Sequence, residues 1–314
     1  MKENKVAAVQ AAGPLFQSAR ALGKIEHFAR RAAENGARLI VFPEAFIGGY
    51  PKGSHFGAPV GSRSDDGRDL FRRYWEAAIE IPGPEVARLA ALAGDLKCDL
   101  VIGAIERAGR DEGGGTLYCA SLVFSADGRF CGRRRKLMPT AAERIVWGCG
   151  DGSTLDAFDV SAGRVGTAIC WENFMPMMRM SQYAQGVELY CAPTVDDRES
   201  WTALMRVIAL EGRCFVISAN QFMRRADAPA DFHPVQGEEP KTVMINGGSV
   251  IVSPLGEILA GPVFGEETIL YAQLDPADIA RGKMDFDVAG HYARADVFKL
   301  KVNRERRSPL ANDD

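Results

Sequence analysis

The sequence predicts an α/β protein built of layers, in which helices cover mixed β-sheets. Short apolar runs rich in β-branched residues alternate along the chain with segments whose apolar residues recur at helical spacing. Two other segments have the strand–turn–strand pattern of a β-hairpin, which requires antiparallel neighbours and excludes a purely parallel, doubly wound sheet. With 314 residues, the chain is long enough to bury a substantial core without disulfides or structural metals.

The predicted strands are short runs that are mostly apolar on both faces. A strand of this kind suits a sheet that is covered on each side, because side chains of both faces are then removed from water. The predicted strands are residues 5–10, 39–44, 99–106, 117–124, 164–170, 187–193, 214–222, 248–254 and 268–274.

Helices are predicted where apolar residues recur three and four positions apart. The first follows Ser18, a candidate N-cap, and ends at Gly36. A second begins at Pro84, which suits a first helical position, and a third covers 201–211 before Gly212. These helices are expected to cover the faces of the sheets.

The turns and loops complete the mixed architecture. Asp127-Gly128 and the segment 254–256 each lie between two extended runs and predict hairpins. The polar segment 223–242 is predicted to be one long loop, and residues 304–314 to be a frayed tail. The sequence contains no internal repeat and no low-complexity linker.

Composition favours small-molecule chemistry. Hydrophobic residues make up 46% and charged residues 25% of the chain, and the formal net charge is −3 with acids and bases intermixed. Such a chain offers no broad basic face to nucleic acid or to an anionic membrane. Its apolar runs are shorter than the roughly 18 residues of a membrane span, and the N-terminal one is too short for a signal peptide. We therefore expect a cytoplasmic protein with no nucleic-acid and no membrane partner.

The cysteines predict neither disulfides nor a metal site. Seven are present, an odd number, and no pair has the C-x-x-C spacing. Cys119, Cys191 and Cys214 lie within apolar runs, where cysteine behaves as a small hydrophobic residue. Cys170 is different, because an apolar run ends there and is followed by Trp171-Glu172-Asn173. This strand-to-turn position would present a nucleophile to a pocket, although packing in the core is the alternative.

Three charged residues could assist a nucleophilic thiol. Glu44 ends an apolar run just after a proline, so its carboxylate would emerge at the same kind of sheet end as Cys170. Lys136 follows Arg133–Arg135 and could supply a fixed positive charge, although a solvated basic cluster is the simpler interpretation and the three arginines are expected at the surface. Glu143 is an ordinary surface acid or a second acid of the pocket.

Together, Glu44, Lys136 and Cys170 in that chain order resemble the nitrilase branch of the carbon–nitrogen hydrolase superfamily. The similarity extends over nearly the whole chain, and Cys-Trp-Glu-Asn followed by Met-Pro is specific to nitrilases and their cyanide-converting relatives. The matching stretches are "VFPEAFIGGYPKG", "RKLMPTAAERIVWG", "GDGSTLDAFD", "AICWENFMP", "YCAPTVDD", "IALEGRCFVISANQF" and "DFDVAGHYARADVF".

The resemblance implies a role for each of these residues. Cys170 is then the nucleophile, Glu44 the general base, Lys136 the stabiliser of the tetrahedral intermediate and Glu143 a second acid of the pocket. It also implies an α-β-β-α sandwich that dimerises to α-β-β-α-α-β-β-α. We expect a single domain over residues 1–300 and a C-terminal tail over 301–314.

The implied activity is hydrolysis of a small organic nitrile to its acid and ammonia, with some amide as by-product and with no cofactor or metal. Arylaliphatic nitriles or β-cyanoalanine are the expected substrates, and Trp171, Thr194 and Tyr50 the expected walls of the pocket. The partners are then this substrate and further copies of the chain, as a homodimer or larger homo-oligomer. An amidase of the same superfamily and a non-catalytic scaffold are the alternatives.

Overall fold

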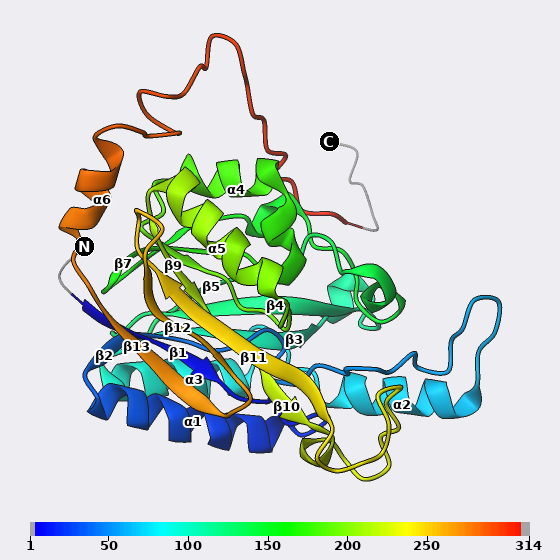
Figure 1. Cartoon of the computed structure of the whole chain (residues 1–314). Helices are drawn as coiled ribbons and strands as arrows, with labels where there is room; N and C mark the ends of the chain where they lie inside the picture. The colour runs from blue at the N-terminus through cyan, green and yellow to red at the C-terminus, as the bar shows by residue number, and fades with distance from the viewer. Residues whose placement is uncertain (1–3, 309–314) are drawn as a thin grey trace.

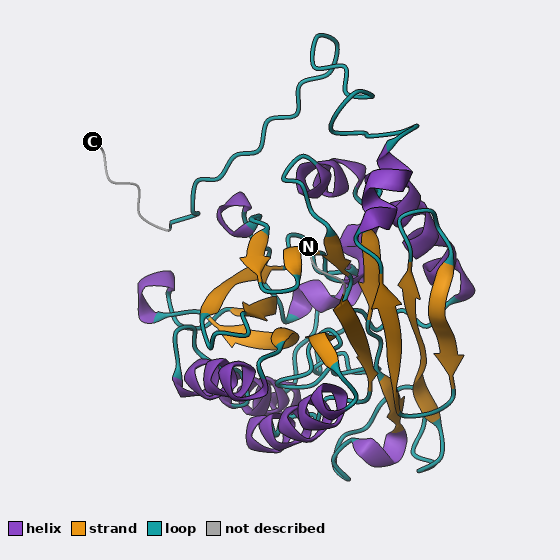
Figure 2. Ribbon diagram, turned by 90° about the vertical axis from the view of Figure 1, so that its left-hand side faces the viewer, coloured by secondary structure: helices purple, strands orange, loops and turns teal. Residues whose placement is uncertain are grey.

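The protein consists of two β-sheets packed face to face, with helices on the outer face of each (Figures 1 and 2). This architecture comes from a computed structural model that describes residues 4–308. Helices α1 and α3 cover the first sheet, and α4 and α5 cover the second (Figure 1). The predicted α-β-β-α sandwich of one chain is therefore confirmed.

Both sheets are mixed, as the hairpins predicted. In the first, β1, β2 and β3 are parallel and the other pairs are antiparallel. In the second, β7, β8 and β9 are parallel and the remaining strands pair antiparallel. The first sheet has the order β13 (Thr268–Leu274), β1 (Asn4–Gln10), β2 (Ala37–Val41), β3 (Asp99–Arg107), β4 (Leu117–Phe124) and β5 (Phe130–Arg135). The second has the order β10 (Phe222–Arg224), β11 (Val243–Val252), β9 (Phe215–Ser218), β8 (Leu189–Cys191), β7 (Gly163–Thr167) and β6 (Phe158–Val160), with β12 (Ile258–Phe264) paired to β11.

The helices include two long ones on the first sheet and several short turns. The α-helices are α1 (Ser18–Glu34), α2 (Asp65–Glu76), α3 (Pro84–Leu96), α4 (Pro176–Tyr183), α5 (Glu199–Gly212) and α6 (Ala277–Lys283). The 3₁₀ helices are η1 (Arg110–Glu112), η2 (Ala141–Ile145), η3 (Gly152–Thr154), η4 (Cys170–Phe174) and η5 (Arg225–Asp227). Within residues 4–308, no helix is long and apolar enough to cross a bilayer.

The core lies in three apolar layers, because alternate side chains of a strand point to opposite faces of its sheet. In β1, Ala7 and Val9 pack against α1 and α3, whereas Val6 and Ala8 pack against the second sheet. The outermost layer on the other side includes the fully buried Trp201 of α5. Burial on both faces explains why these strands are apolar throughout, as the sequence indicated.

Several predicted boundaries are wrong in detail. Ser18 is the first helical residue, not the N-cap, and its hydroxyl donates to the carbonyl of Ala77 instead of capping α1. The predicted strand 214–222 is divided into β9 and β10, and the predicted strand 164–170 ends at Thr167. The long loop 223–242 is confirmed except for the end of β10 and the turn η5. Both predicted hairpins, β4–β5 and β11–β12, are confirmed.

The predicted frayed tail is wrong for its first residues. Arg304 pairs with Asp156, Arg306 pairs with Glu112 at 2.9 Å, and the amide of Arg307 donates to Asp151 at 2.8 Å. These contacts hold the segment against the body of the protein. Residues 309–314 lie outside the described residues.

Candidate active site

Cys170 lies in a sharp turn after β7. Its φ angle is +51°, in the left-handed region, which costs a non-glycine residue on the order of 1 kcal/mol. The turn is held by the Cys170 amide, which donates to Pro193 at 2.9 Å, and by the Asn173 side chain, which donates to the Cys170 carbonyl at 2.8 Å. The hydroxyl of Thr194 donates to the sulfur at 3.3 Å. These contacts hold the thiol in a fixed position at the turn, which fits a functional role for it.

Glu44 lies just beyond β2 and is fully buried. Its backbone passes so close to β3 that a side chain at Gly103 would meet the carbonyl oxygen of Pro43 at 2.1 Å. The side-chain amide of Gln221 donates through Nε2 to the backbone carbonyl of Glu44 at 2.7 Å and fixes the other side. The position of this carboxylate is therefore determined by backbone packing between the two sheets.

The two carboxylate oxygens of Glu44 differ in their contacts. Oε1 accepts from Lys136 Nζ at 2.7 Å and from Cys119 Sγ at 3.6 Å. Oε2 is buried without a hydrogen-bond partner in residues 4–308. The Cys170 thiol is near enough to act on the pKa of Glu44 by hydrogen bonding. One oxygen is therefore held in place, while the other is free to accept a proton.

Lys136 lies directly after β5 and is fully buried between two acids. Its Nζ is 2.7 Å from Glu44 Oε1 and 2.7 Å from Glu143 Oε2. Burial lowers the pKa of Lys136, but the negative charges facing it outweigh burial and raise this pKa well above its ordinary value. The ammonium is therefore a fixed positive charge, and the alternative of a solvated lysine is wrong.

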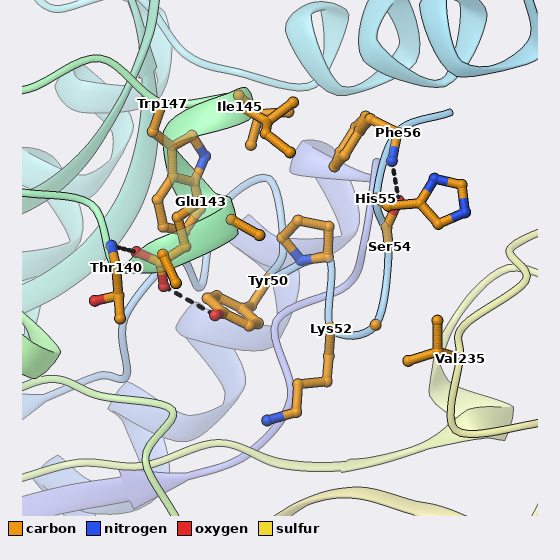
Figure 3. A pocket seen from close by; sticks show the side chains of 15 residues that line it. Tyr50, Lys52, Ser54, His55, Phe56, Thr140, Glu143, Ile145, Trp147 and Val235 are labelled. Atoms are coloured by element: carbon orange, nitrogen blue, oxygen red, sulfur yellow. Dashed lines mark hydrogen bonds between the residues drawn. The ribbon is translucent and has the colours of Figure 1, made fainter. Parts of the chain in front are cut away.

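Glu143 belongs to this cluster and does not pair with Arg144 as a surface acid would. Tyr50 donates to its Oε1 at 2.9 Å, and the amide of Thr140 donates to its Oε2 at 2.6 Å (Figure 3). Together with Lys136, these contacts direct the carboxylate inward from η2. The structure thus brings all four predicted residues, Glu44, Lys136, Glu143 and Cys170, to one place.

The charges of the site set the protonation of its acid and its thiol. Burial raises the pKa of Glu44 to about 7, and Lys136 opposes this increase. Burial, and next the charge of Glu44, raise the pKa of the Cys170 thiol above its ordinary value. The resting thiol is therefore protonated at neutral pH, and a nucleophilic role would require a nearby group to accept its proton.

Two neighbouring hollows lie beside the cluster of Glu44, Lys136, Glu143 and Cys170. One, of about 310 Å³, is lined by Cys170, Trp171 and Tyr50 among others, and the second, of about 370 Å³, shares Tyr50, Lys52, Thr140 and Glu143 with it. The second hollow extends past Phe56, Ile145 and Trp147 and is largely apolar (Figure 3). Thr194 supports the sulfur instead of lining either hollow.

Sequence reasoning missed one contact of the cluster and the burial of two arginines near it in the chain. Cys119, predicted to be plain core, is buried but directs its sulfur at Glu44. Arg134, predicted at the surface, is fully buried, and Arg135 is nearly so, because Arg134 pairs with Glu172 and Arg135 with Glu106. Alternation along β5 places Arg134 on the same face as Lys136, and that spacing was the available signal.

This sandwich gathers a thiol, a carboxylate and an ammonium just beyond its strands, a set of groups that a hydrolase with a cysteine nucleophile would need. The model of the carbon–nitrogen hydrolase family matches residues 5–284. The chain belongs to the carbon–nitrogen hydrolase family, in its nitrilase branch.

Relatives agree with this assignment, and a solved structure agrees with the fold. The chain is 54% identical over 299 residues to a nitrilase of Bradyrhizobium diazoefficiens, covering 95% of this chain and 92% of the relative. It is 53% identical over 307 residues to a bifunctional nitrilase/nitrile hydratase of Lupinus angustifolius, covering 96% and 86%. A member of the nitrilase superfamily from Saccharomyces cerevisiae has the same fold, with a TM-score of 0.69 and 24% identity over 93% of this chain and 97% of that one.

Proposed function

We propose that this enzyme hydrolyses organic nitriles to carboxylic acids and ammonia, with Cys170 as the nucleophile. The observation that carries the proposal is the contact of Glu44, Lys136 and Glu143 beside the Cys170 sulfur and an open hollow. Relatives that are named nitrilases at about half identity support the choice of a nitrile as substrate.

The first step joins the sulfur of Cys170 to the nitrile carbon. Glu44 Oε2 takes the thiol proton as the S–C bond forms, which is required because the resting thiol is protonated. The proton passes to the nitrile nitrogen, so a neutral thioimidate results. Lys136, held 2.7 Å from Glu44, stabilises negative charge as it develops on nitrogen.

Water completes the reaction in two further additions. Glu44 takes a proton from the first water as the water oxygen bonds to the thioimidate carbon. The nitrogen receives this proton from Glu44 and a second one from the new hydroxyl group, and the C–N bond then breaks, so that ammonia leaves and a thioester remains. A second water adds to the remaining thioester, the S–C bond breaks, and the acid is released while the proton returns to Cys170. If the S–C bond breaks before the C–N bond, the amide is released, as the name of the lupin relative suggests for that protein.

The other predicted residues have supporting roles in this proposal. Glu143, which accepts a hydrogen bond from Tyr50, is the second acid that holds Lys136, while Thr194 orients the sulfur. Trp171, fixed by a 2.9 Å hydrogen bond to Asp196, forms a wall of the hollow. The apolar second hollow favours an arylaliphatic substituent over the amino-acid group of β-cyanoalanine.

Ammonia release from matched nitriles and amides tests the proposed function. An arylaliphatic, an aliphatic and an amino-acid nitrile are compared with the amide of each. We expect kcat/KM to be higher for each nitrile that is turned over than for its amide, and highest for the arylaliphatic one. Faster turnover of the amides would assign the enzyme as an amidase, and no turnover of any compound would favour the scaffold.

The pH dependence of kcat/KM is expected to follow Glu44. The carboxylate must be ionised to accept the thiol proton, and its pKa is raised to about 7. Activity should therefore fall as the pH decreases through about 7, by about tenfold per unit below it. Lys136 should cause no loss on the alkaline side, because its pKa is raised well above its ordinary value. A flat profile between pH 5.5 and 8 would contradict this role of Glu44.

We further propose that two chains pair through the outer faces of α4 and α5. Large apolar side chains are exposed there, with Met177 68%, Val207 45% and Leu210 40% exposed. Light scattering after size exclusion should give at least twice the chain mass of 34.1 kDa. The double variant Val207→Glu, Leu210→Lys should dissociate, whereas a monomeric parent would refute the pairing.

A cytoplasmic location stays a prediction.

A further inference from the structure

Glu172 links the segment that carries Lys136 to the turn that carries Cys170. Its Oε1 accepts from Arg134 Nη2 at 2.9 Å and from the Leu137 amide at 2.7 Å. Its Oε2 accepts from Arg134 Nη1 at 2.7 Å and from the Ile169 amide at 2.9 Å. Arg134 is in β5 and Leu137 follows Lys136 just beyond that strand, while Ile169 precedes Cys170 just beyond β7. One carboxylate thus connects the two sheets at the site.

These contacts leave Glu172 no acceptor for a substrate proton. An ionised carboxylate has about four acceptor positions, and here four N–H groups occupy them. The side chains of Glu172 and Arg134 are both fully buried. Although it lies two residues from Cys170, Glu172 is therefore not placed to act as an acid or base.

A buried ion pair such as this one is a weak source of stability, because desolvation offsets most of the Coulomb attraction. A well-packed apolar pair would serve the core about as well. The bidentate pairing of Arg134 instead fixes orientation, because its two parallel hydrogen bonds hold the guanidinium and the Glu172 carboxylate in one relative geometry. The same carboxylate also fixes two backbone amides, so the pair defines geometry on both sides of the site.

We propose that Glu172 and Arg134 form a clamp that sets the distance and orientation of Lys136 relative to Cys170. The clamp is a positioning device for the proposed reaction, on which this inference rests, and it touches neither substrate nor reacting atoms. When it is broken, the turn of Cys170 relaxes and the segment of Lys136 shifts. A displacement of about 1 Å at a reacting group can lower a rate on the order of 100-fold.

Two substitutions test the clamp without removing bulk. Glu172→Gln keeps the shape but turns one acceptor into a donor facing two N–H groups, and Arg134→Lys keeps the charge but loses the fork. We expect each to lower kcat by about tenfold to hundredfold, with KM changed less than about threefold because the walls of the hollow remain. The double variant should be no slower than the slower single one, since the clamp is already broken.

The pH profile separates positioning from simple loss of stability. Displacement of Lys136 removes a charge that lowers the pKa of Glu44, so the acid limb of kcat/KM should move upward by about one pH unit. Lys136 also lowers the pKa of Cys170, so alkylation of Cys170 by iodoacetamide, followed by peptide mapping, should slow about tenfold at fixed pH. Alkylation requires no nitrile and is therefore independent of the proposed function.

The matched control is Glu106→Gln. Glu106 is equally buried and pairs with Arg133 and Arg135 of the same strand, but it does not contact the turn of Cys170. It should lose stability without a change in the pH limb or in alkylation. If Glu172→Gln fails to fold, Arg134→Lys carries the test.

Three results would overturn the clamp: kcat within twofold of the parent in both variants, equal losses in Glu106→Gln, or full activity in Arg134→Lys with a large loss only in Glu172→Gln. The last would make Glu172 a direct participant in the chemistry. A parent enzyme without nitrile turnover would refute the proposed function instead, and the alkylation rates would still decide the clamp.

Discussion

Cys170→Ala is expected to abolish nitrile turnover, lowering kcat/KM by at least about 10⁴-fold. Every step proposed above passes through a bond to this sulfur, and Cys119, the thiol that contacts Glu44, cannot replace it. Cys119 directs its sulfur at Glu44 from within β4, and burial raises its pKa well above the ordinary value. Ammonia release by purified protein at saturating nitrile measures the effect.

The control for this prediction is Cys214→Ala. Cys214 is fully buried between the second sheet and α5, away from the four-residue cluster. Losing its sulfur should cost stability on the order of 1 kcal/mol and leave kcat unchanged. The thermal unfolding midpoint of Cys170→Ala should fall no further than that of Cys214→Ala, because both substitutions remove one buried sulfur atom. Turnover by folded Cys170→Ala would refute covalent catalysis at this residue.

Glu44→Gln is expected to lower kcat by about 10²- to 10⁴-fold while the fold persists. The amide oxygen can still accept from Lys136 at the position of Oε1, so the packing of the site is kept. The amide cannot take the thiol proton, and the protonated thiol is a poor nucleophile. The loss should appear in both attack on the nitrile and hydrolysis of the thioester, because Glu44 serves both steps.

Steady-state kinetics and circular dichroism on the same preparation test this prediction, again with Glu106→Gln as the control. The acid limb near pH 7 should disappear from the residual activity of Glu44→Gln, since the titrating group is gone. Retained activity with an intact acid limb would remove Glu44 from the mechanism and assign the titration to another group.

The layers could be predicted well from the sequence, because buried positions of strands and helices are occupied by apolar residues. The residues of β1 are apolar on both faces because both faces are covered. Asp-Gly between two extended runs, as at Asp127-Gly128, is typical of a hairpin turn. Helix α2 was missed because its surface is mostly polar, with only Gly67 and Tyr74 buried. Its position depends on contacts from distant segments, such as the pairing of Arg73 with Asp231.

At the site, the sequence predicted which charged side chains and which thiol gather, but not their supports. Glu44 and Cys170 each end an apolar run, and Lys136 comes directly after β5, so all three lie just beyond strands of the sandwich. The clamp of Arg134 and Glu172 joins residues from different sheets, so no local pattern records it. Three successive arginines look solvated in sequence, yet Arg134 and Arg135 are both buried, because each pairs with a buried acid on its own face of β5.

Rapid acid quenching of the parent enzyme during nitrile turnover, followed by intact-protein mass measurement and peptide mapping, tests covalent catalysis most directly. A chain heavier by the acyl or imidoyl group of the substrate, modified at Cys170 and unmodified in Cys170→Ala, is the predicted result. Ammonia released at the full rate from saturating nitrile while Cys170 stays unmodified, or modification at another residue, would contradict it.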